Sequence, residues 1–343
     1  MGTTFTEATL KGQNIKEIDD SALTLTRRKS GRGHAYYTGD GTKISDRKVL
    51  KRVKSLVIPP MWTDVHICKF EDGHIQATGR DLKGRKQYIY HVRYEKYRQA
   101  EKFKKLFNFV TKLPKFRKRA KEDLSRSGWP KVKLLALITM LLDEYGIRIG
   151  NKVYKDRNAT YGLTTLRRKH LNVDSNNVVF SFKGKSGQTR EVFIDDAELV
   201  PFIKQAAELP GYEIFRFRDE GRKFRAIDSE DVNGYIMKVI GKDYSSKYFR
   251  TWTANRLAMD YYPLALEIKE AGSKKKFGTI LFNMVANALG NTPKICKEYY
   301  VHPAILAKVN SEKVPFPNPF QDHGGMGLSA SEQLAKHLIA QSY

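Results

Sequence analysis

The sequence predicts an α+β protein with a small β-rich N-terminal domain, residues 1–100, and a larger, mainly α-helical domain. Short aromatic and β-branched segments with Gly and Pro punctuation run from Lys29 to about Arg93, which is typical of strands. From Tyr94 onward apolar residues recur at helical spacing, and residues 178–194 return to strand-like alternation. A chain of 343 residues is long enough for about two domains.

The N-terminal domain is expected to contain a hairpin and a further strand. Met1–Thr26 is polar, and we expect it to be partly loose. Val65–Phe70 and His74–Thr78 alternate on either side of Glu71-Asp72-Gly73, which predicts a hairpin. Aromatic and polar residues interleave over Lys86–Val92, which predicts the next strand.

Residues 101–122 are expected to form a basic linker or first helix. The basic residues here, from Lys102 to Lys121, fit either a solvated helix face or a surface that contacts phosphates. Their spacing does not separate these two interpretations.

Residues 123–343 are expected to form the mainly α-helical domain with a β-hairpin at 178–194. The hairpin turns at Gly184-Lys-Ser-Gly187, and Pro263 is expected to break or kink one helix. The predicted helices are Leu134–Tyr145 with a stop at Gly146, Asp196–Glu208, Thr253–Ala271, Lys276–Leu289 and Ser329–Gln341.

Composition points to a polyanionic partner. There are 62 Lys and Arg against 37 Asp and Glu, a formal net charge of +25, which favours nucleic acid over a membrane surface. The alternative is a generally solvated basic surface. Cys68 and Cys296 give neither a disulfide framework nor metal-ligand spacing, so a reducing compartment is expected. No signal peptide, membrane span, metal cluster or nucleotide-binding loop is recognisable.

Two adjacent tyrosines near the C-terminus, Tyr299 and Tyr300, follow the well-spaced cations Arg148, Lys185 and Arg250. A phenol is a poor nucleophile at its usual pKa of about 10. It becomes useful where cations neutralise a phosphate and stabilise the charge that develops during attack. The pattern therefore suggests attack on a phosphodiester. Chemistry alone does not choose between the two tyrosines, and most of the 18 tyrosines are expected to be packing residues.

Each cation also has an ordinary structural interpretation. Arg148 follows a buried helix and suits phosphate oxygens, although it could simply satisfy the helix C-terminus. Lys185, in the predicted turn, could donate a proton to a leaving oxygen, but lysine is common in exposed turns. Arg250 is flanked by aromatic residues ahead of an expected N-capped helix. It should be partly buried and either phosphate-facing or in a structural ion pair.

The segment Lys83–His91 combines cations, an amide and two tyrosines in one expected strand. Lys, Arg and Gln can read base edges in the major groove. The alternative is an exposed strand whose tyrosines pack inward.

In their joint order these motifs resemble the type IB DNA topoisomerases, in the short form found in poxviruses and bacteria. The N-terminal domain of that family is matched by Ile58-Pro-Pro-Met-Trp62, Gln76-Ala-Thr-Gly-Arg-Asp81 and Lys83–His91. Its catalytic domain is matched by Arg148-Ile-Gly-Asn151, Tyr161-Gly-Leu-Thr-Thr-Leu-Arg167, Phe182-Lys-Gly-Lys185, Lys247-x-x-Arg250 and Asn291 to Tyr300. The resemblance implies the tyrosine recombinase and topoisomerase IB fold, closing as a C-shaped clamp on duplex DNA.

The resemblance also implies residue roles. Tyr300, nine residues beyond Asn291, matches the nucleophile rather than Tyr299. Lys185, directly after the turn glycine, matches the general acid rather than Lys183. The resemblance makes Arg148, Arg250 and Asn291 stabilisers of the phosphate oxygens, with Asn291 standing where many members carry His. Candidate DNA contacts are Lys83, Arg85, Gln87, Tyr88, Tyr90, Tyr154, Thr164, Thr165 and Lys247.

The implied activity is relaxation of supercoiled duplex DNA by transient single-strand cleavage through a 3′-phosphotyrosyl intermediate, strand swivelling and religation. It implies no metal, ATP or other cofactor, and a monomer that is cytoplasmic, nucleoid-associated or, in a virus, in the virion. A tyrosine recombinase is the nearest rival, but recombinases usually carry His-x-x-Arg where this chain has Lys247-x-x-Arg250. A non-catalytic basic DNA-binding protein would explain the charge but not the ordered set.

Overall fold

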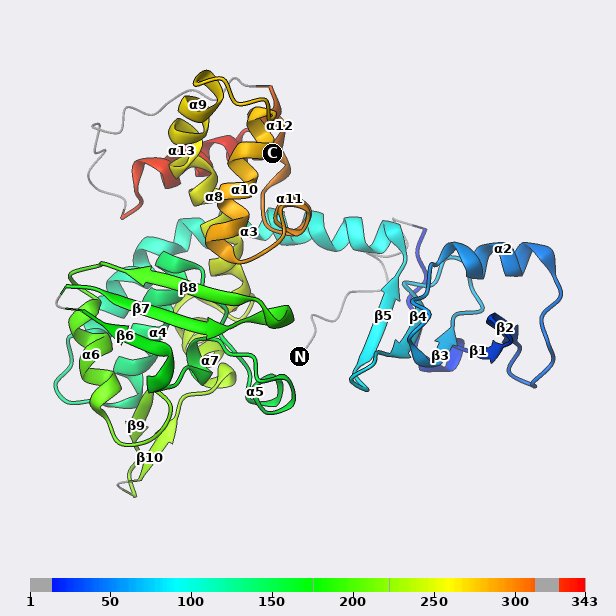
Figure 1. Ribbon diagram of the computed structural model, residues 1–343, viewed down its shortest axis with the longest axis horizontal. Helices are drawn as coiled ribbons and strands as arrows, with labels where there is room; N and C mark the ends of the chain where they lie inside the picture. Colours follow the sequence, from blue (N-terminus) through cyan, green and yellow to red (C-terminus); the bar gives the residue numbers. More distant parts are fainter. Residues whose placement is uncertain (1–13, 175, 222, 312–326, 343) are drawn as a thin grey trace. The chain divides into compact units, whose positions relative to one another are not determined.

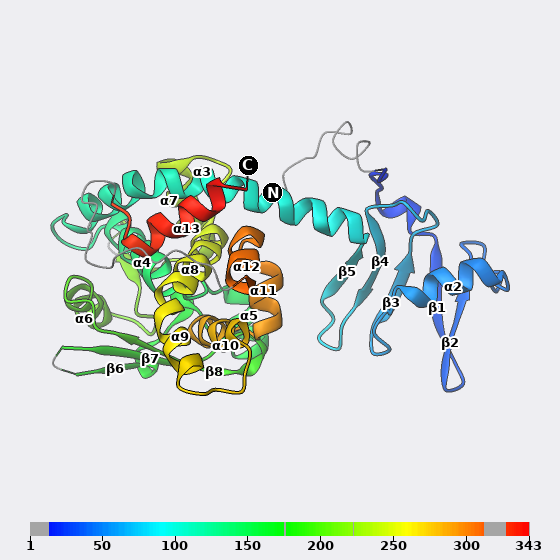
Figure 2. The same cartoon turned by 90° about the horizontal axis from the view of Figure 1, so that it is seen from above.

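The computed structural model describes residues 14–174, 176–221, 223–311 and 327–342, except for the side chain of Tyr154 (Figures 1 and 2). The chain divides into two compact units, Met1–Lys102 and Phe103–Tyr343. Half of Met1–Thr26, expected to be partly loose, lies outside the described residues. The predicted α+β class is confirmed, with strands dominating the first unit and helices the second.

The first unit is built on a five-stranded antiparallel sheet in the order β2-β1-β3-β4-β5. A short 3₁₀ turn, Asp20–Ala22, precedes it. The strands are β1 Leu25–Ser30, β2 Gly33–Tyr37, β3 Thr63–Ile67, β4 Ile75–Arg80 and β5 Lys86–Tyr90. The expected hairpin is confirmed as β3 and β4, and the expected next strand as β5.

The expectation of strands alone between Lys29 and Arg93 is wrong, because α2 (Arg47–Ser55) lies within this range. The Asp46 carboxylate accepts hydrogen bonds from the Lys48 and Val49 backbone amides and so caps its first turn. Val53 is buried one turn beyond Val49 and packs against the sheet. The helix is short and largely basic, so its apolar stripe gives only a weak sequence signal.

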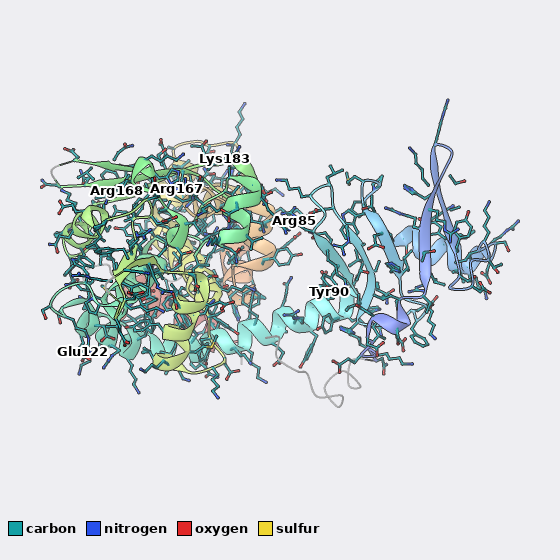
Figure 3. All side chains as sticks on the ribbon, turned by 90° about the horizontal axis from the view of Figure 1, so that it is seen from below. Arg85, Tyr90, Glu122, Arg167, Arg168 and Lys183 are labelled. Atoms are coloured by element: carbon teal, nitrogen blue, oxygen red, sulfur yellow. The ribbon has the colours of Figure 1, made fainter. Side chains whose placement is uncertain are left out.

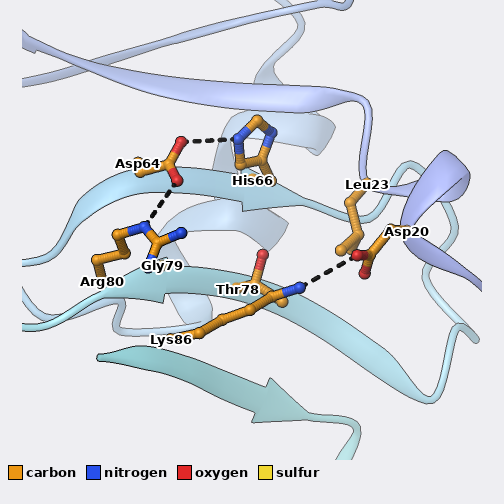
Figure 4. A pocket seen from close by; sticks show the side chains of 8 residues that line it. All are labelled: Asp20, Leu23, Asp64, His66, Thr78, Gly79, Arg80 and Lys86. Carbon is orange, nitrogen blue, oxygen red and sulfur yellow. Dashed lines mark hydrogen bonds and ion pairs between the residues drawn. The ribbon is translucent and has the colours of Figure 1, made fainter. Parts of the chain in front are cut away.

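The two faces of this sheet differ in chemistry. One face packs beneath α2 through a cluster formed by Leu25, Val53, Ile58, Val65, Ile67 and Ala77. The other face carries polar side chains around a pocket of about 270 Å³ (Figure 4). There Asp64 bonds both His66, at 3.0 Å, and Arg80, at 3.3 Å, while Lys86 bonds Asp20 at 3.1 Å. Strand alternation therefore separates an apolar core face from a polar outer face.

The second unit is mainly helical and carries a small sheet, β6-β7-β8, and a separate pair, β9 and β10 (Figure 1). The strands are β6 Leu171–Val173, β7 Val178–Lys183, β8 Thr189–Ile194, β9 Arg216–Arg218 and β10 Phe224–Ala226. The α-helices are α3 Val92–Leu124, which begins in the range of the first unit, α4 Lys131–Tyr145, α5 Lys152–Asn158, α6 Val200–Glu208, α7 Ser229–Ile240, α8 Ser246–Asp260, α9 Tyr262–Glu270, α10 Phe277–Leu289, α11 Pro293–Tyr299, α12 Pro303–Asn310 and α13 Ala330–Ala340.

The helix expected over Thr253–Ala271 breaks at Pro263 as expected, but it begins earlier than expected. It is two helices, because Pro263 stands in the first turn of α9, where a missing backbone N–H costs nothing. The first of them, α8, begins at Ser246, so Arg250 lies inside a helix rather than ahead of one. Phe249 and Trp252 are fully buried, and this packing extends the helix through an aromatic segment. The stop at Gly146 is confirmed, in a left-handed conformation with φ of 56°.

A buried ionic network ties the last helix to the core of the second unit. Glu332 of α13 is 1% exposed. It accepts hydrogen bonds from Arg117 of α3, at 2.7 and 2.8 Å, and from the indole of Trp252 in α8, at 2.8 Å. Arg117 also donates to Asp143 of α4 at 2.6 Å. One guanidinium therefore joins three helices, and one of its carboxylate partners also bonds α8.

We expect Arg117→Met to lower the free energy of unfolding by about 3–5 kcal/mol, because Asp143 and Glu332 would be left buried without their partner. The measurement is urea unfolding at pH 7. Lys121→Met is the matched control, since Lys121 pairs with Glu198 at the surface and should cost less than about 1 kcal/mol. Equal losses in the two variants would contradict the role given to the network.

Candidate active site

Arg250 links the C-terminal ends of two helices. It is 5% exposed, and its two terminal nitrogens donate to the carbonyl of Gly146, after α4, and to that of Leu289, the last residue of α10. The last carbonyls of a helix lack partners within it and carry partial negative charge. They therefore hold a buried guanidinium without neutralising its formal charge.

Arg148 and Asn291 form the next part of the site. Arg148 donates to the Asn291 side-chain oxygen at 2.5 Å and to the Gly290 carbonyl at 3.3 Å. Because arginine can only donate, the amide oxygen of Asn291 must face Arg148. The Asn291 amide nitrogen is buried and has no acceptor among the described residues. A buried donor without a partner is uncommon and indicates a place for an acceptor from a ligand.

The segment Tyr161–Arg167 supports Arg148 through the backbone. Leu163 and Thr164 donate their amides to the carbonyls of Arg148 and Ile149, at 2.9 and 2.8 Å. A Cβ atom at Gly162 would overlap the Arg148 carbonyl and the Gly150 backbone. Glycine is therefore the residue that permits this close approach.

Thr164 and Thr165, expected to contact DNA, are buried. Their hydroxyls donate to the carbonyls of Ile149 and Gly162, each at 3.0 Å. The burial of both side chains does not support direct contact with DNA. It gives them instead a part in holding the Arg148 segment.

Tyr300 lies at the end of α11, beside Arg250. Its ring centroid is 5.4 Å from the Arg250 guanidinium carbon, and the ring packs against the core of the second unit. Asn255 holds this backbone by donating to the Tyr300 carbonyl at 3.0 Å and accepting from the His302 amide at 2.7 Å. Tyr299, by comparison, is 40% exposed.

The site concentrates positive charge. Burial and, after it, the charge of Arg148 lower the pKa of Arg250 to about 10, while Tyr300 opposes this shift. Burial also lowers the pKa of Arg148, again opposed by Tyr300. In the described part of the chain neither guanidinium forms an ion pair with a carboxylate. Both remain charged at neutral pH and available to an anion.

Lys185 lies in the turn between β7 and β8 and is exposed. Lys183 ends β7 just before it (Figure 3), and its side chain lies against the turn at Gly187. Sequence reasoning missed a nearby arginine, Arg190 on β8, which is buried and donates to carbonyls at the end of α10. Strand alternation could have identified Arg190 as buried, because it lies on the same, inward-facing side of β8 as Val192 and Ile194.

The candidate DNA contacts on β5 are divided between the two faces of the first unit's sheet. Tyr88 and Tyr90 stack with ring centroids 5.8 Å apart, and the Lys86 ammonium lies 5.4 Å from the Tyr88 ring centroid. Gln87 has the opposite parity and donates to Asp81 at 3.0 Å.

Asp81 organises the turn between β4 and β5, which contains Lys83. It also accepts hydrogen bonds from the Arg85 backbone amide, at 3.0 Å, and from the Arg85 guanidinium, at 2.7 Å. These bonds from Arg85 help to lower the Asp81 pKa to about 2. Arg85 and Tyr90 are both labelled in Figure 3.

The two remaining candidates lie in the second unit. Lys247 is exposed in the first turn of α8. Tyr154 belongs to α5, but its side chain is outside the described residues.

Among the described residues, no group of three or more His, Cys, Asp and Glu side chains could hold a metal ion. In the same residues no helix is both long and apolar enough to cross a membrane.

Comparisons with known proteins identify the family of the chain. Residues 86–315 match the family described as eukaryotic DNA topoisomerase I, catalytic core, and residues 33–81 match the bacterial DNA topoisomerase IB N-terminal domain. DNA topoisomerase 1B of Acanthamoeba polyphaga mimivirus is 32% identical over 288 residues, covering 81% of this chain and 84% of the relative. DNA topoisomerase 1B of vaccinia virus, strain Copenhagen, is 25% identical over 275 residues, covering 77% and 82%.

Among solved structures, a XerH site-specific recombinase bound to its palindromic difH substrate covers 55% of this chain and 46% of its own, with 14% identity and a TM-score of 0.35. That likeness is too weak to support an argument.

The chain belongs to the type IB DNA topoisomerases. It is an isomerase that relaxes supercoiled DNA by transient single-strand cleavage through a covalent phosphotyrosine intermediate, followed by religation.

We expect Gly162→Ala to reduce DNA cleavage by about 100-fold, because the added methyl would displace the Arg148 backbone, and a misplacement of about 1 Å can cost this much. The measurement is single-turnover cleavage with excess enzyme. Gly234→Ala is the matched control. Gly234 lies in α7 with nothing within 4 Å of an added Cβ, so activity should be unchanged and stability slightly raised. Normal cleavage by Gly162→Ala would remove the proposed support of Arg148.

Proposed function

We propose that Tyr300 is the nucleophile and that Arg148, Arg250 and Asn291 form the pocket for the phosphate it attacks. The observation that carries this proposal is the convergence of the buried Arg250 guanidinium, the half-buried Arg148 guanidinium, an unpartnered amide donor and the Tyr300 ring at one place. Within the described residues no carboxylate pairs with either arginine. A phosphodiester would supply the missing negative charge.

The pocket contains donors that an attacked phosphate would satisfy. The Asn291 amide nitrogen and the Arg250 Nε are both buried without acceptors in the described part of the chain. The non-bridging oxygens of a phosphodiester are acceptors, and they gain charge as the phenolic oxygen attacks. The two donors would therefore bind more strongly in the transition state than in the ground state, which is the requirement for rate enhancement.

Lys185 would act as the general acid. When the bond from phosphorus to the 5′ oxygen breaks, the Lys185 ammonium would give its proton to that oxygen and the attacking Tyr300 phenol would lose its own proton to water, leaving a 5′-hydroxyl and a 3′-phosphotyrosyl bond. Religation would run the same steps backwards, with Lys185 accepting the proton as the hydroxyl attacks and Tyr300 leaves. The phosphotyrosyl bond conserves the energy of the broken phosphodiester, so ATP is not required, and the guanidinium groups of Arg148 and Arg250 would supply the positive charge that a metal ion could otherwise provide.

We further propose duplex DNA as the partner, bound by a monomer without a cofactor. The cations and stacked tyrosines of the first unit, together with the formal charge of +25, suit phosphate and base contacts. The proposed contacts are Lys83, Arg85, Gln87, Tyr88, Tyr90, Tyr154 and Lys247. We propose that the protein acts where DNA is found: the cytoplasm, the nucleoid or a virion.

We expect Tyr300→Phe to abolish both supercoil relaxation and the covalent protein–DNA adduct, because the attacking oxygen is absent. Non-covalent binding should persist, since the arginines remain. The measurement is adduct trapping on a denaturing gel with mass-spectrometric mapping of the modified residue. Tyr299→Phe is the matched control and should keep the adduct. An adduct on residue 299, or full activity of Tyr300→Phe, would refute the assignment.

We expect Asn291→His to introduce a pH dependence that the natural residue lacks, because an amide does not titrate. Free His has a pKa of about 6.5, and the nearby guanidinium groups should lower it. The protonated ring donates to the phosphate, so the variant should gain cleavage rate relative to the parent as pH falls below about 6.5. The measurement is the ratio of the two cleavage rates from about pH 5.5 to 8. A flat ratio would show that residue 291 does not face the phosphate.

A further inference from the structure

Arg190 is a third arginine at the end of α10, buried like Arg250, and neither the sequence motifs nor the proposed mechanism accounts for it. Its side chain is 9% exposed. It donates to the carbonyls of Asn287 and Ala288, at 3.1 and 3.0 Å. Burial and, after it, the charge of Arg148 lower the pKa of Arg190 to about 10. Among the described residues it has no carboxylate partner, so a purely structural ion pair does not explain it.

Two glycines enclose the Arg190 side chain. A Cβ atom at Gly290 would collide with the guanidinium, and one at Gly184 would lie 3.0 Å from the Arg190 Cγ. Gly290 directly precedes Asn291, and its carbonyl accepts a hydrogen bond from Arg148 at 3.3 Å. Gly184 directly precedes Lys185. One side chain therefore touches both the segment of the phosphate pocket and the turn that carries the candidate general acid.

The turn itself provides little restraint on Lys185. Within the turn, the Gly184 amide donates to the Gln188 carbonyl at 2.8 Å, and the Gly187 amide donates to the Gly184 carbonyl at 3.1 Å. Ser186 and Gly187 both have positive φ, at 64° and 78°. The turn is exposed and has weak local preferences, so its placement depends on an anchor. The fork of Arg190 on two successive carbonyls is such an anchor, because a planar guanidinium fixes direction as well as distance.

We propose that Arg190 is a positioning residue that fixes the Lys185 turn against the end of α10, so that the Lys185 ammonium reaches the leaving 5′ oxygen. This inference rests on the proposed function of Lys185 as the general acid. Arg190 does not donate the proton. Arg190 holds Lys185 in the position from which its ammonium donates the proton. Loss of Arg190 should therefore slow only the step in which the leaving oxygen is protonated.

The test compares an ordinary DNA substrate with one whose bridging 5′ oxygen is replaced by sulfur, a leaving group that does not need protonation. Arg190→Gln should slow single-turnover cleavage of the ordinary substrate about 100-fold, as expected for a displaced catalytic group. On the sulfur substrate the cleavage rate of Arg190→Gln should be within about threefold of the parent rate, because the general acid is no longer required. Glu191→Gln, on the same strand and exposed, is the matched control and should behave as the parent on both substrates.

The result that would overturn the inference is equal slowing on the two substrates, which would indicate a general structural or phosphate-charge role. Normal cleavage of the ordinary substrate by Arg190→Gln would overturn it as well. Lys185→Ala is measured in parallel, since failure of the sulfur substrate to rescue that variant would refute the general acid itself. Rescue of Lys185→Ala but not of Arg190→Gln would refute only the positioning role.

The double variant and a conservative variant complete the test. If both residues serve one step, Lys185→Ala with Arg190→Gln should be no slower than Lys185→Ala alone. A double variant whose rate loss equals the product of the two single losses would contradict the proposal. Should Arg190→Gln fail to fold, Arg190→Lys keeps the charge but loses the fork. It should fold as judged by thermal unfolding, and it should show the same oxygen-specific defect.

Discussion

The active site depends on one arrangement: buried or half-buried guanidinium groups that donate to carbonyls at the C-terminal end of helices. Arg250 donates to the carbonyls of Gly146 and Leu289, Arg148 to that of Gly290, and Arg190 to those of Asn287 and Ala288. Carbonyls offer partial charge only, so they orient the cations without cancelling them. A carboxylate in the same place would neutralise the pocket and exclude a phosphate. The end of α10 thus holds positive charge ready for an anion.

Burying uncompensated cations is unfavourable, and other parts of the second unit must offset it. Carboxylates on the helices of the second unit pair with other arginines. Asp143 and Glu332 bond Arg117, and Glu144 bonds Arg256 at 2.9 Å. These pairs hold α3, α4, α8 and α13 together. The helices that present the site are therefore stabilised by ion pairs, while the site itself has none in the described residues.

The first unit shows a different constraint, imposed by the two-residue repeat of a strand. Lys86, Tyr88 and Tyr90 share the polar face of the sheet, whereas Gln87 and Ile89 have the opposite parity, with Ile89 packed beneath α2. Successive residues along β5 point to opposite faces of the sheet, so the candidate contact residues cannot all lie on one surface. Asp81 adds to this separation by bonding both Gln87 and Arg85.

The sequence by itself determined the α+β class, the hairpin with Lys185 in its turn, the helix stop at Gly146 and the family, because these depend on local periodicity or on motifs in a fixed order. It did not determine α2 or the true start of α8, where burial of Val53, Phe249 and Trp252 outweighs weak local signals. Only the tertiary structure decided that Thr164 and Thr165 are internal and that Arg190 joins two distant segments. These contacts depend on which backbone carbonyls and which glycines come together in space, and the spacing of residues along the chain does not reveal this.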